Sequence, residues 1–200
     1  MLLWLGCAGA AMAADKPGTV LVLGDSLSAA HNIAAAQGWV HLLEVRLGDM
    51  EPGWTAINAS ISGETSLSGR NRLPALLEKY HPGVVVLELG ANDGLRGLPV
   101  PAAEANLRAM VDASRQAGAR VLLVGMRMPP NYGRDYADKF FAMYGALSKS
   151  TKVPLAPFML DGVAEKPDLF QPDRLHPLAE AHPIILANIW PHLLPILKAK

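Results

Sequence analysis

The chain has 200 residues, half of them hydrophobic, and its 18 lysines and arginines balance 18 aspartates and glutamates. This length and composition are typical of one globular domain with a sizeable core. The zero net charge and the lack of a basic cluster argue against binding to nucleic acid, and the lack of an acidic run argues against disorder. We therefore expect a monomer that acts on a small molecule.

The first 13 residues differ from the rest because they carry no charge and are rich in Leu, Ala and Gly. Ala11-Met12-Ala13 has the small-x-small pattern of a cleavage site, so the sequence predicts a signal peptide at 1–13 and a single domain at 14–200. The expected location is periplasmic or secreted, although no Lys or Arg precedes the apolar run. That run is too short to span a bilayer, so we expect no stable membrane insertion after its removal.

The single cysteine, Cys7, lies inside this N-terminal segment. The mature chain is therefore predicted to have no disulfide and no thiolate metal site. No His, Asp and Glu residues show metal-ligand spacing, and no phosphate-loop or dinucleotide glycine pattern is present. We expect neither a metal nor another cofactor.

Strand-like apolar runs alternate with longer amphipathic segments along the chain. The predicted strands are 19–23, 55–59, 84–89, 120–126 and 153–156. The predicted helices are 38–48, 70–80, 101–117, 136–150 and 178–198, the last with breaks or kinks at Pro183, Pro191 and Pro195. The continuous apolar runs are typical of strands buried on both faces. The sequence thus predicts a three-layer α/β/α sandwich around a five-stranded parallel sheet.

Polar segments follow the predicted strands, and in such a fold they meet at one edge of the sheet, where ligands bind. These segments are 24–28, 58–66, 90–93, 129–133 and 173–177. Ser26 comes directly after the first strand, where the free N–H groups of a starting helix favour negative charge. Taken alone, Ser26 is equally typical of a helix N-cap.

The residues in these segments have the chemistry of acyl transfer. Ser26 is the candidate nucleophile, His176 the candidate general base, and Asp173 the group that fixes the tautomer of His176. The backbone N–H groups of Ser26 and Gly63 and the side-chain amide of Asn92 are candidate donors to an oxyanion.

Other polar residues near these positions have alternative interpretations. His31, five residues after Ser26, is a competing candidate base or else a residue at the pocket rim, and it lacks a carboxylate at comparably short spacing. Asp25 and Asp93 are expected to have structural hydrogen-bonding roles. Because the chain has no Gly-x-Ser-x-Gly string, an ordinary α/β-hydrolase nucleophile elbow is not expected.

Together these residues resemble the SGNH, or GDSL, hydrolase family, which is named for a serine, glycine, asparagine and histidine in four separate blocks. Here they match Ser26, Gly63, Asn92 and His176, with Asp173 completing the triad. The resemblance extends from about residue 19 to the last helix and is closest to bacterial TesA-type multifunctional thioesterase, lysophospholipase and arylesterase proteins. The strings that carry it are 58–63, 72–77, 92–97 and 131–133.

The resemblance implies a flavodoxin-like SGNH-hydrolase fold and a serine enzyme that hydrolyses carboxylic esters and thioesters through an acyl-enzyme on Ser26. The implied substrates are aryl and short-to-medium acyl esters, acyl-CoA and lysophospholipids. An acyltransferase or deacetylase that acts on cell-envelope glycans with the same site is the alternative. Any peptidase activity is expected to be weak.

The predicted substrate-lining residues lie in two glycine-flanked segments, 94–97 and 129–133, which we expect to be mobile lips over the substrate. They are Leu95, Arg96, Pro130 and Tyr132. Methionine and phenylalanine residues near the strand ends are expected to be mostly core, with a few lining an acyl groove.

The chain departs from the family pattern at three places. Ala91 stands where a second glycine often precedes the asparagine, and it would strain the backbone if that position needs a positive φ. Ala30 replaces a glycine after the serine block, and Arg174-Leu175 replaces the more usual Gly-Ile between the aspartate and the histidine. We expect the two alanines to shift the floor of the pocket, and thereby to slow the enzyme or to narrow its range of substrates.

Overall fold

A computed structural model describes residues 18–199, apart from the side chain of Pro130. The predicted signal peptide and Cys7 therefore lie outside the described residues. Five parallel strands form one sheet in the order β2-β1-β3-β4-β5. They are β1 (Gly18–Gly24), β2 (Trp54–Asn58), β3 (Val84–Glu88), β4 (Arg120–Val124) and β5 (Leu155–Ala156). This strand order is that of flavodoxin-like folds, so the predicted parallel sheet is confirmed.

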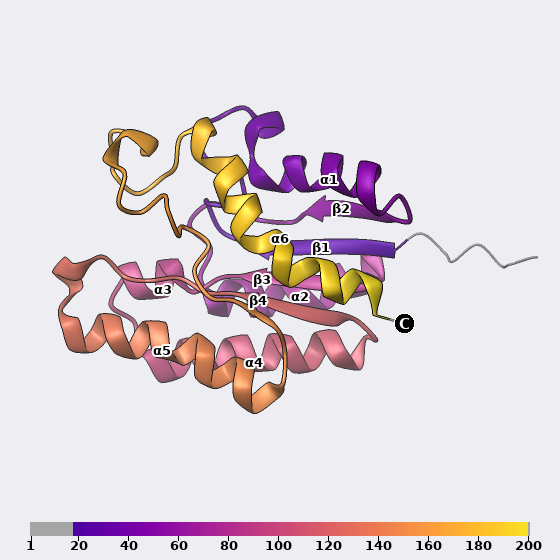
Figure 1. The fold of residues 1–200 in the computed structure, drawn as a ribbon. Helices are drawn as coiled ribbons and strands as arrows, with labels where there is room; N and C mark the ends of the chain where they lie inside the picture. The colour runs from indigo at the N-terminus through magenta and orange to yellow at the C-terminus, as the bar shows by residue number, and fades with distance from the viewer. Residues whose placement is uncertain (1–17, 200) are drawn as a thin grey trace, which may run out of the picture.

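Helices cover both faces of the sheet, as Figure 1 shows. They are α1 (Trp39–Met50), α2 (Ser66–Tyr80), α3 (Ala91–Leu95), α4 (Val100–Gln116), α5 (Arg134–Thr151) and α6 (His182–Lys198). Helices α1 and α6 pack together on one face, and α2, α4 and α5 pack on the other. The short α3 lies beyond the end of β3, in a stretch that the sequence analysis treated as a loop. The three predicted layers are therefore present.

The core lies on both sides of the central strands. All five residues of β3 are buried, and so are the last five residues of β1. Full burial of one Val or Leu side chain contributes about 1.5–3 kcal/mol of transfer free energy, so these strands anchor the sheet. The continuous apolar run at β3 correctly indicated burial on both faces.

The last helix differs from its prediction. A 3₁₀ turn, Ala179–Ala181, precedes α6, which begins at His182 and continues through Pro191 and Pro195. Pro183 lies in the first turn, where a missing N–H leaves no hydrogen bond unmade. The expected breaks at the two later prolines are wrong, because buried side chains of α6 on both sides of them hold the helix on the sheet.

Three predicted strands are longer than the observed ones, and the strand predicted at 84–89 exceeds β3 by a single residue. β4 ends at Val124 and not at residue 126, and β5 contains only Leu155 and Ala156. Pro154 has no N–H to donate to a neighbouring strand, which explains the late start of β5. Among the described residues no helix is both long and apolar enough to cross a bilayer.

Candidate active site

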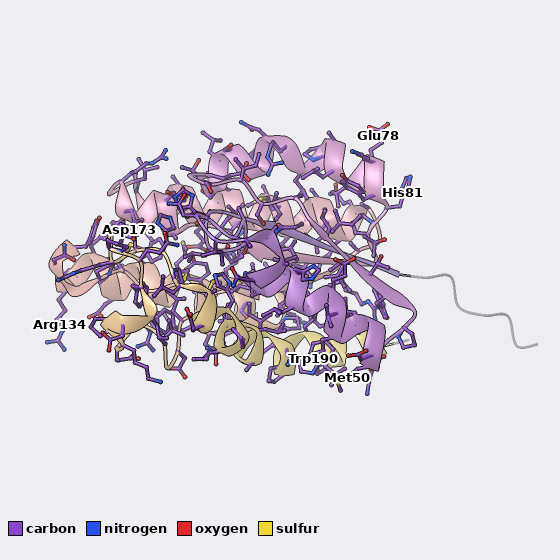
Figure 2. The ribbon with its side chains drawn as sticks, turned by 90° about the horizontal axis from the view of Figure 1, so that it is seen from above. Met50, Glu78, His81, Arg134, Asp173 and Trp190 are labelled. Carbon is purple, nitrogen blue, oxygen red and sulfur yellow. The ribbon has the colours of Figure 1, made fainter. Side chains whose placement is uncertain are left out.

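The site lies at the carboxyl ends of the strands. Figure 2 shows Asp173 at one end of the molecule, on the same side as Arg134, whereas Glu78 and His81 mark the opposite end. β1 ends at Gly24, and a Cβ atom there would lie 2.6 Å from Oε2 of Glu88 and 2.7 Å from Oγ of Ser28. Only glycine therefore lets the turn that carries Ser26 pack this closely on β3.

The structure brings Ser26 together with Asp173 and His176, which lie about 150 residues later in the chain. Oγ of Ser26 lies 2.9 Å from Nε2 of His176, and Nδ1 of His176 lies 2.8 Å from Oδ2 of Asp173. Both distances are within hydrogen-bonding range. The arrangement can move a proton from the serine to the histidine while the carboxylate orients the ring.

A short turn at 173–176 fixes the positions of the carboxylate and the imidazole. Oδ1 of Asp173 accepts hydrogen bonds from the backbone N–H groups of Leu175 and His176, at 2.9 and 3.0 Å. These bonds, above all the one from His176, lower the pKa of Asp173 to about 2, so the carboxylate is ionised at neutral pH. Arg174 has a φ of 58°, in the left-handed region that favours glycine. The family departure at this position therefore strains the backbone.

The oxyanion candidates lie on neighbouring segments, and the amide of Asn92 must exchange one of its two present acceptors for the oxyanion during the reaction. Nδ2 of Asn92, in the first turn of α3, donates to Oδ2 of Asp25 and to the carbonyl oxygen of Glu64, at 3.2 and 3.1 Å. Gly63, with a φ of 80°, lies in the turn before α2, and its carbonyl oxygen accepts a hydrogen bond from Arg96. The bonds of Asn92 link its amide both to the nucleophile turn and to the turn of Gly63.

The left-handed backbone conformation that favours glycine occurs at Ala30 and not at Ala91. Ala91 is the first residue of α3, and the positive φ of 117° belongs to Gly90 before it. The condition for strain at Ala91, a positive φ, is therefore not met, because the preceding glycine makes the turn. Ala30 has a φ of 57°. Its predicted effect on rate or substrate range stays a prediction.

Two buried carboxyl groups lie beneath the nucleophile. Oδ1 of Asp25 accepts from the N–H of Leu27 at 3.0 Å, and burial raises the pKa of Asp25 to about 6. Oε2 of Glu88 accepts from the hydroxyl of Ser28 at 2.6 Å and from the N–H of Asp25 at 3.3 Å. Burial, and then the nearby Asp25, raise the pKa of Glu88 well above its usual value. Asp25 therefore has the expected structural role.

Two further acidic side chains position the surrounding loops. The carboxylate of Asp93 accepts from the N–H and the hydroxyl of Ser66, at 2.7 and 2.6 Å, at the start of α2. Asp93 is thus a loop stabiliser, as expected. Buried Glu64 accepts from Nε of Arg72 at 2.7 Å, and Arg72 also donates to the carbonyl oxygen of Ala59. The sequence did not predict the Glu64–Arg72 pair. Glu64 lies in a loop and Arg72 in α2, eight residues later, and no regular helix or strand spacing connects two such positions.

His31 lies beside His176 but does not replace it. The two ring centroids are 4.2 Å apart, and Nδ1 of His31 lies 3.2 Å from Oγ of Ser62. The hydrogen bond with Ser26 belongs to His176. Of the two candidate bases, the geometry therefore selects His176.

A cavity of about 880 Å³ opens beside Ser26 and His176. Its lining is mostly apolar and includes Leu95, Met126, Met128, Phe158, Leu160 and Phe170. Met126, Met128 and Phe158 belong to the methionines and phenylalanines of which a few were expected to line an acyl groove. The contribution of Leu160 and Phe170, in the segment after β5, was not predicted. Apolar residues interspersed with prolines in the segment after β5 were the only sequence signal for this contribution to the lining.

The predicted lining residues have different positions. Leu95 lines the cavity, whereas Arg96 and Tyr132 do not. Arg96 instead donates to the carbonyl oxygen of Gly63, and the hydroxyl of Tyr132 donates to that of Leu95 at 3.2 Å. Arg96 therefore contacts the turn of Gly63, and Tyr132 contacts the end of α3. The prediction for Pro130 lies outside the described residues, and mobility of the two lips stays a prediction.

No set of three or more His, Cys, Asp or Glu side chains within residues 18–199 is grouped closely enough to hold a metal ion.

The arrangement of a serine, a histidine and an aspartate at the carboxyl edge of a flavodoxin-like sheet defines a class of hydrolase. The model of the GDSL-like lipase/acylhydrolase family matches residues 22–184, and the chain belongs to this family. It is an ester hydrolase of that family.

Curated relatives cover most of the chain. It is 48% identical to the esterase TesA of Pseudomonas aeruginosa, over 90% of this chain and 89% of the relative. It is 42% identical to an arylesterase of Vibrio mimicus, over 92% and 91% of the two chains. It is also 42% identical to thioesterase 1/protease 1/lysophospholipase L1 of Escherichia coli strain K12, over 93% and 86%.

A crystal structure of TesA has the same fold. The TM-score is 0.87 at 47% identity, and the match covers 89% of this chain and 99% of the other. The similarity therefore extends over most of this chain and nearly all of the other.

Proposed function

We propose that this ester hydrolase acts on carboxylic esters and thioesters through an acyl-enzyme on Ser26. The observation that carries the proposal is the continuous hydrogen-bonded chain from Ser26 through His176 to Asp173, with distances of 2.9 and 2.8 Å. No other serine, histidine and carboxylate among the described residues are joined in this way by the hydrogen bonds of the structure.

In the first half-reaction Oγ of Ser26 attacks the acyl carbonyl carbon, and Nε2 of His176 takes the hydroxyl proton. The carbonyl oxygen becomes an oxyanion, which the N–H groups of Ser26 and Gly63 and the amide of Asn92 stabilise. When the intermediate collapses, His176 returns its proton to the alcohol or thiol that leaves. The acyl group remains as an ester on Ser26.

In the second half-reaction a water molecule replaces the departed alcohol or thiol. His176 takes one proton from the water as its oxygen attacks the acyl carbon, and the same donors stabilise the second oxyanion. The proton then returns to Oγ of Ser26, and the carboxylic acid leaves. The ionised Asp173 stabilises the imidazolium form of His176 in both halves.

The cavity supports the choice of substrates. The cavity has a volume of about 880 Å³ and a mostly apolar lining, which suits an aryl group or a short-to-medium acyl chain. The relatives' names include arylesterase, thioesterase and lysophospholipase. We therefore propose aryl esters, acyl-CoA thioesters and lysophospholipids as the range for this chain.

Replacing the nucleophile tests the proposal. Ser26→Ala is expected to lower kcat for 4-nitrophenyl butyrate by at least about a thousandfold, because the acyl-enzyme can no longer form. A fluorophosphonate probe should label the wild type but not the variant. The matched control is Ser150→Ala, which changes a serine on α5 that accepts a hydrogen bond from Arg108. This variant should keep both activity and labelling.

Retained esterase activity in folded Ser26→Ala would refute the proposal. Product analysis with an added sugar or alcohol distinguishes hydrolysis from acyl transfer. Free acid as the main product supports a hydrolase, and an acylated sugar as the main product would instead indicate a transferase.

A further inference from the structure

Arg174 occupies an unfavourable backbone position in the turn at 173–176. The two bonds that Oδ1 of Asp173 accepts from the N–H groups of Leu175 and His176 close this turn, and Arg174 lies inside it with a φ of 58°. A residue with a Cβ atom is disfavoured there relative to glycine. A strained residue beside reacting groups is a reason to look for a function of its side chain.

Arg174 is one of the residues that line the same cavity as Ser26 and His176. It is exposed, and within residues 18–199 no carboxylate lies within 4 Å of its guanidinium. The neighbouring carboxylate of Asp173 is directed instead to Nδ1 of His176. Arg174 therefore adds a positive charge to the lining of the cavity, and this charge has no ionic partner among the described residues.

The other charged residues that line the cavity are placed differently. Arg127 stacks over the rings of Phe141 and Phe158, at 4.2 and 5.1 Å. Arg134 lies 3.7 Å from Asp138. Glu165 is the remaining exposed acid of the lining. Arg174 is thus the arginine of this group with neither an aromatic nor a carboxylate partner in the described structure.

The mechanism gives the side of the substrate that Arg174 faces. His176 returns its proton to the leaving alcohol or thiol, so the leaving group lies against His176. Arg174 is two residues away, which limits the separation of their Cα atoms to less than about 7.6 Å. Because the arginine side chain adds its own reach to this separation, Arg174 can bind an anion that lies a few bonds from the ester oxygen, while the apolar lining takes the acyl chain.

We propose that Arg174 is a specificity-determining residue that binds the phosphate of a glycerophosphate leaving group. This inference rests on the proposed ester hydrolysis and adds a residue that chooses among esters. The planar guanidinium presents several N–H donors that match the oxygens of a phosphate. The phosphates of coenzyme A are separated from the thioester by the long pantetheine arm, so Arg174 should affect them less.

Matched substrates isolate the phosphate. One pair is 1-octanoylglycerol 3-phosphate and 1-octanoylglycerol, and the other is octanoyl-CoA and octanoyl-pantetheine. The measured quantity is the ratio of kcat/KM within each pair at low salt. Arg174→Gln is expected to lower the glycerol-pair ratio by roughly fivefold, the upper range for an exposed ion pair, and to change the CoA-pair ratio less.

Further variants separate charge from backbone effects. Arg174→Lys should retain most of the phosphate preference, since it keeps the charge. Arg174→Gly should lose the preference as Arg174→Gln does, although glycine suits the turn. The control is Arg115→Gln, which removes the same charge from α4, outside this cavity, and should leave both ratios unchanged. Raising the salt concentration should weaken the preference of the wild type but not of Arg174→Gln.

An unchanged glycerol-pair ratio in both Arg174→Gln and Arg174→Gly would overturn this inference while ester hydrolysis stands. An equal loss in Arg115→Gln would overturn it too, because the effect would then come from net charge. A larger loss in the CoA pair than in the glycerol pair would assign Arg174 to the coenzyme phosphates instead. A wild type that cleaves neither member of either pair would refute the proposed function itself.

Discussion

The two halves of the candidate active site are built in opposite ways. The turn of Ser26 rests on buried polar groups, with Asp25 1% exposed and Glu88 fully buried. The turn of His176 lies at the surface, where the side chain of Asp173 is 40% exposed. Long-range contacts hold the first turn, whereas mainly local hydrogen bonds hold the second. Asp173 accepts from residues two and three positions ahead, and the backbone N–H of Gln171 donates to the carbonyl oxygen of His176.

This difference separates stability from activity. Changes to the buried side should unfold or weaken the protein, because they leave cavities and unpaired polar groups. Changes to the exposed turn should leave the fold intact and remove activity. Three variants test the contrast, in order of decreasing effect.

Asp173→Asn should produce the largest effect on activity. Asparagine keeps the oxygen that accepts from the backbone N–H groups, but its amide cannot accept the proton of Nδ1, so His176 takes the wrong tautomer. We expect kcat to fall by about a thousandfold to ten thousandfold with 4-nitrophenyl butyrate. The melting temperature should change little, because the side chain is partly exposed. A melting temperature that falls as far as that of a core variant would contradict the contrast.

Glu88→Ala should destabilise the protein by about 3 kcal/mol, because it opens a cavity under the nucleophile and leaves the hydroxyl of Ser28 without its acceptor. That hydroxyl also accepts from Nε1 of Trp39 at 3.1 Å, so the loss extends toward α1. Urea unfolding measures the change. Asp173→Ala is the matched comparison and should cost less than about 1 kcal/mol. Equal losses in the two variants would show that both turns carry the fold.

Asp25→Asn should change how stability depends on pH. The pKa of Asp25 is about 6 in the folded protein, above the ordinary 3.8, because burial disfavours the carboxylate. As the pH rises from about 4 to 6, the unfolded chain releases a proton that the folded protein retains, so the contribution of Asp25 to stability is lost. Relative to the wild type, the variant should gain at most about 3 kcal/mol across this interval.

Unfolding free energies at pH 4, 5, 6 and 7 measure this gain. Asp112→Asn, at an exposed position on α4, is the control and should show a constant difference from the wild type. A constant difference for Asp25→Asn as well would mean that Asp25 has the same pKa in the folded and unfolded chains.

The sequence by itself determined the architecture and the candidate reacting groups. Continuous apolar runs at β1, β3 and β4 alternate with amphipathic helices. This alternation predicts a parallel sheet between two layers of helices, because a strand buried on both faces is apolar throughout and a covering helix is apolar on one side only. The resemblance of four short blocks then selected Ser26, Gly63, Asn92 and His176. These residues follow different strands, and parallel strands bring their carboxyl ends to one edge.

Only the tertiary structure decided how the site is supported. No spacing rule connects Glu88 with Ser28 or Asn92 with Asp25, because those contacts depend on the order of the strands and on burial. The choice between His31 and His176 likewise required the distance to Ser26. The backbone strain fell on Arg174 and Ala30, and Ala91 escaped it because Gly90 makes the turn. The local sequence identifies the candidate side chains. Their distances, their burial and the φ angles beside them are set only when distant segments of the chain pack together.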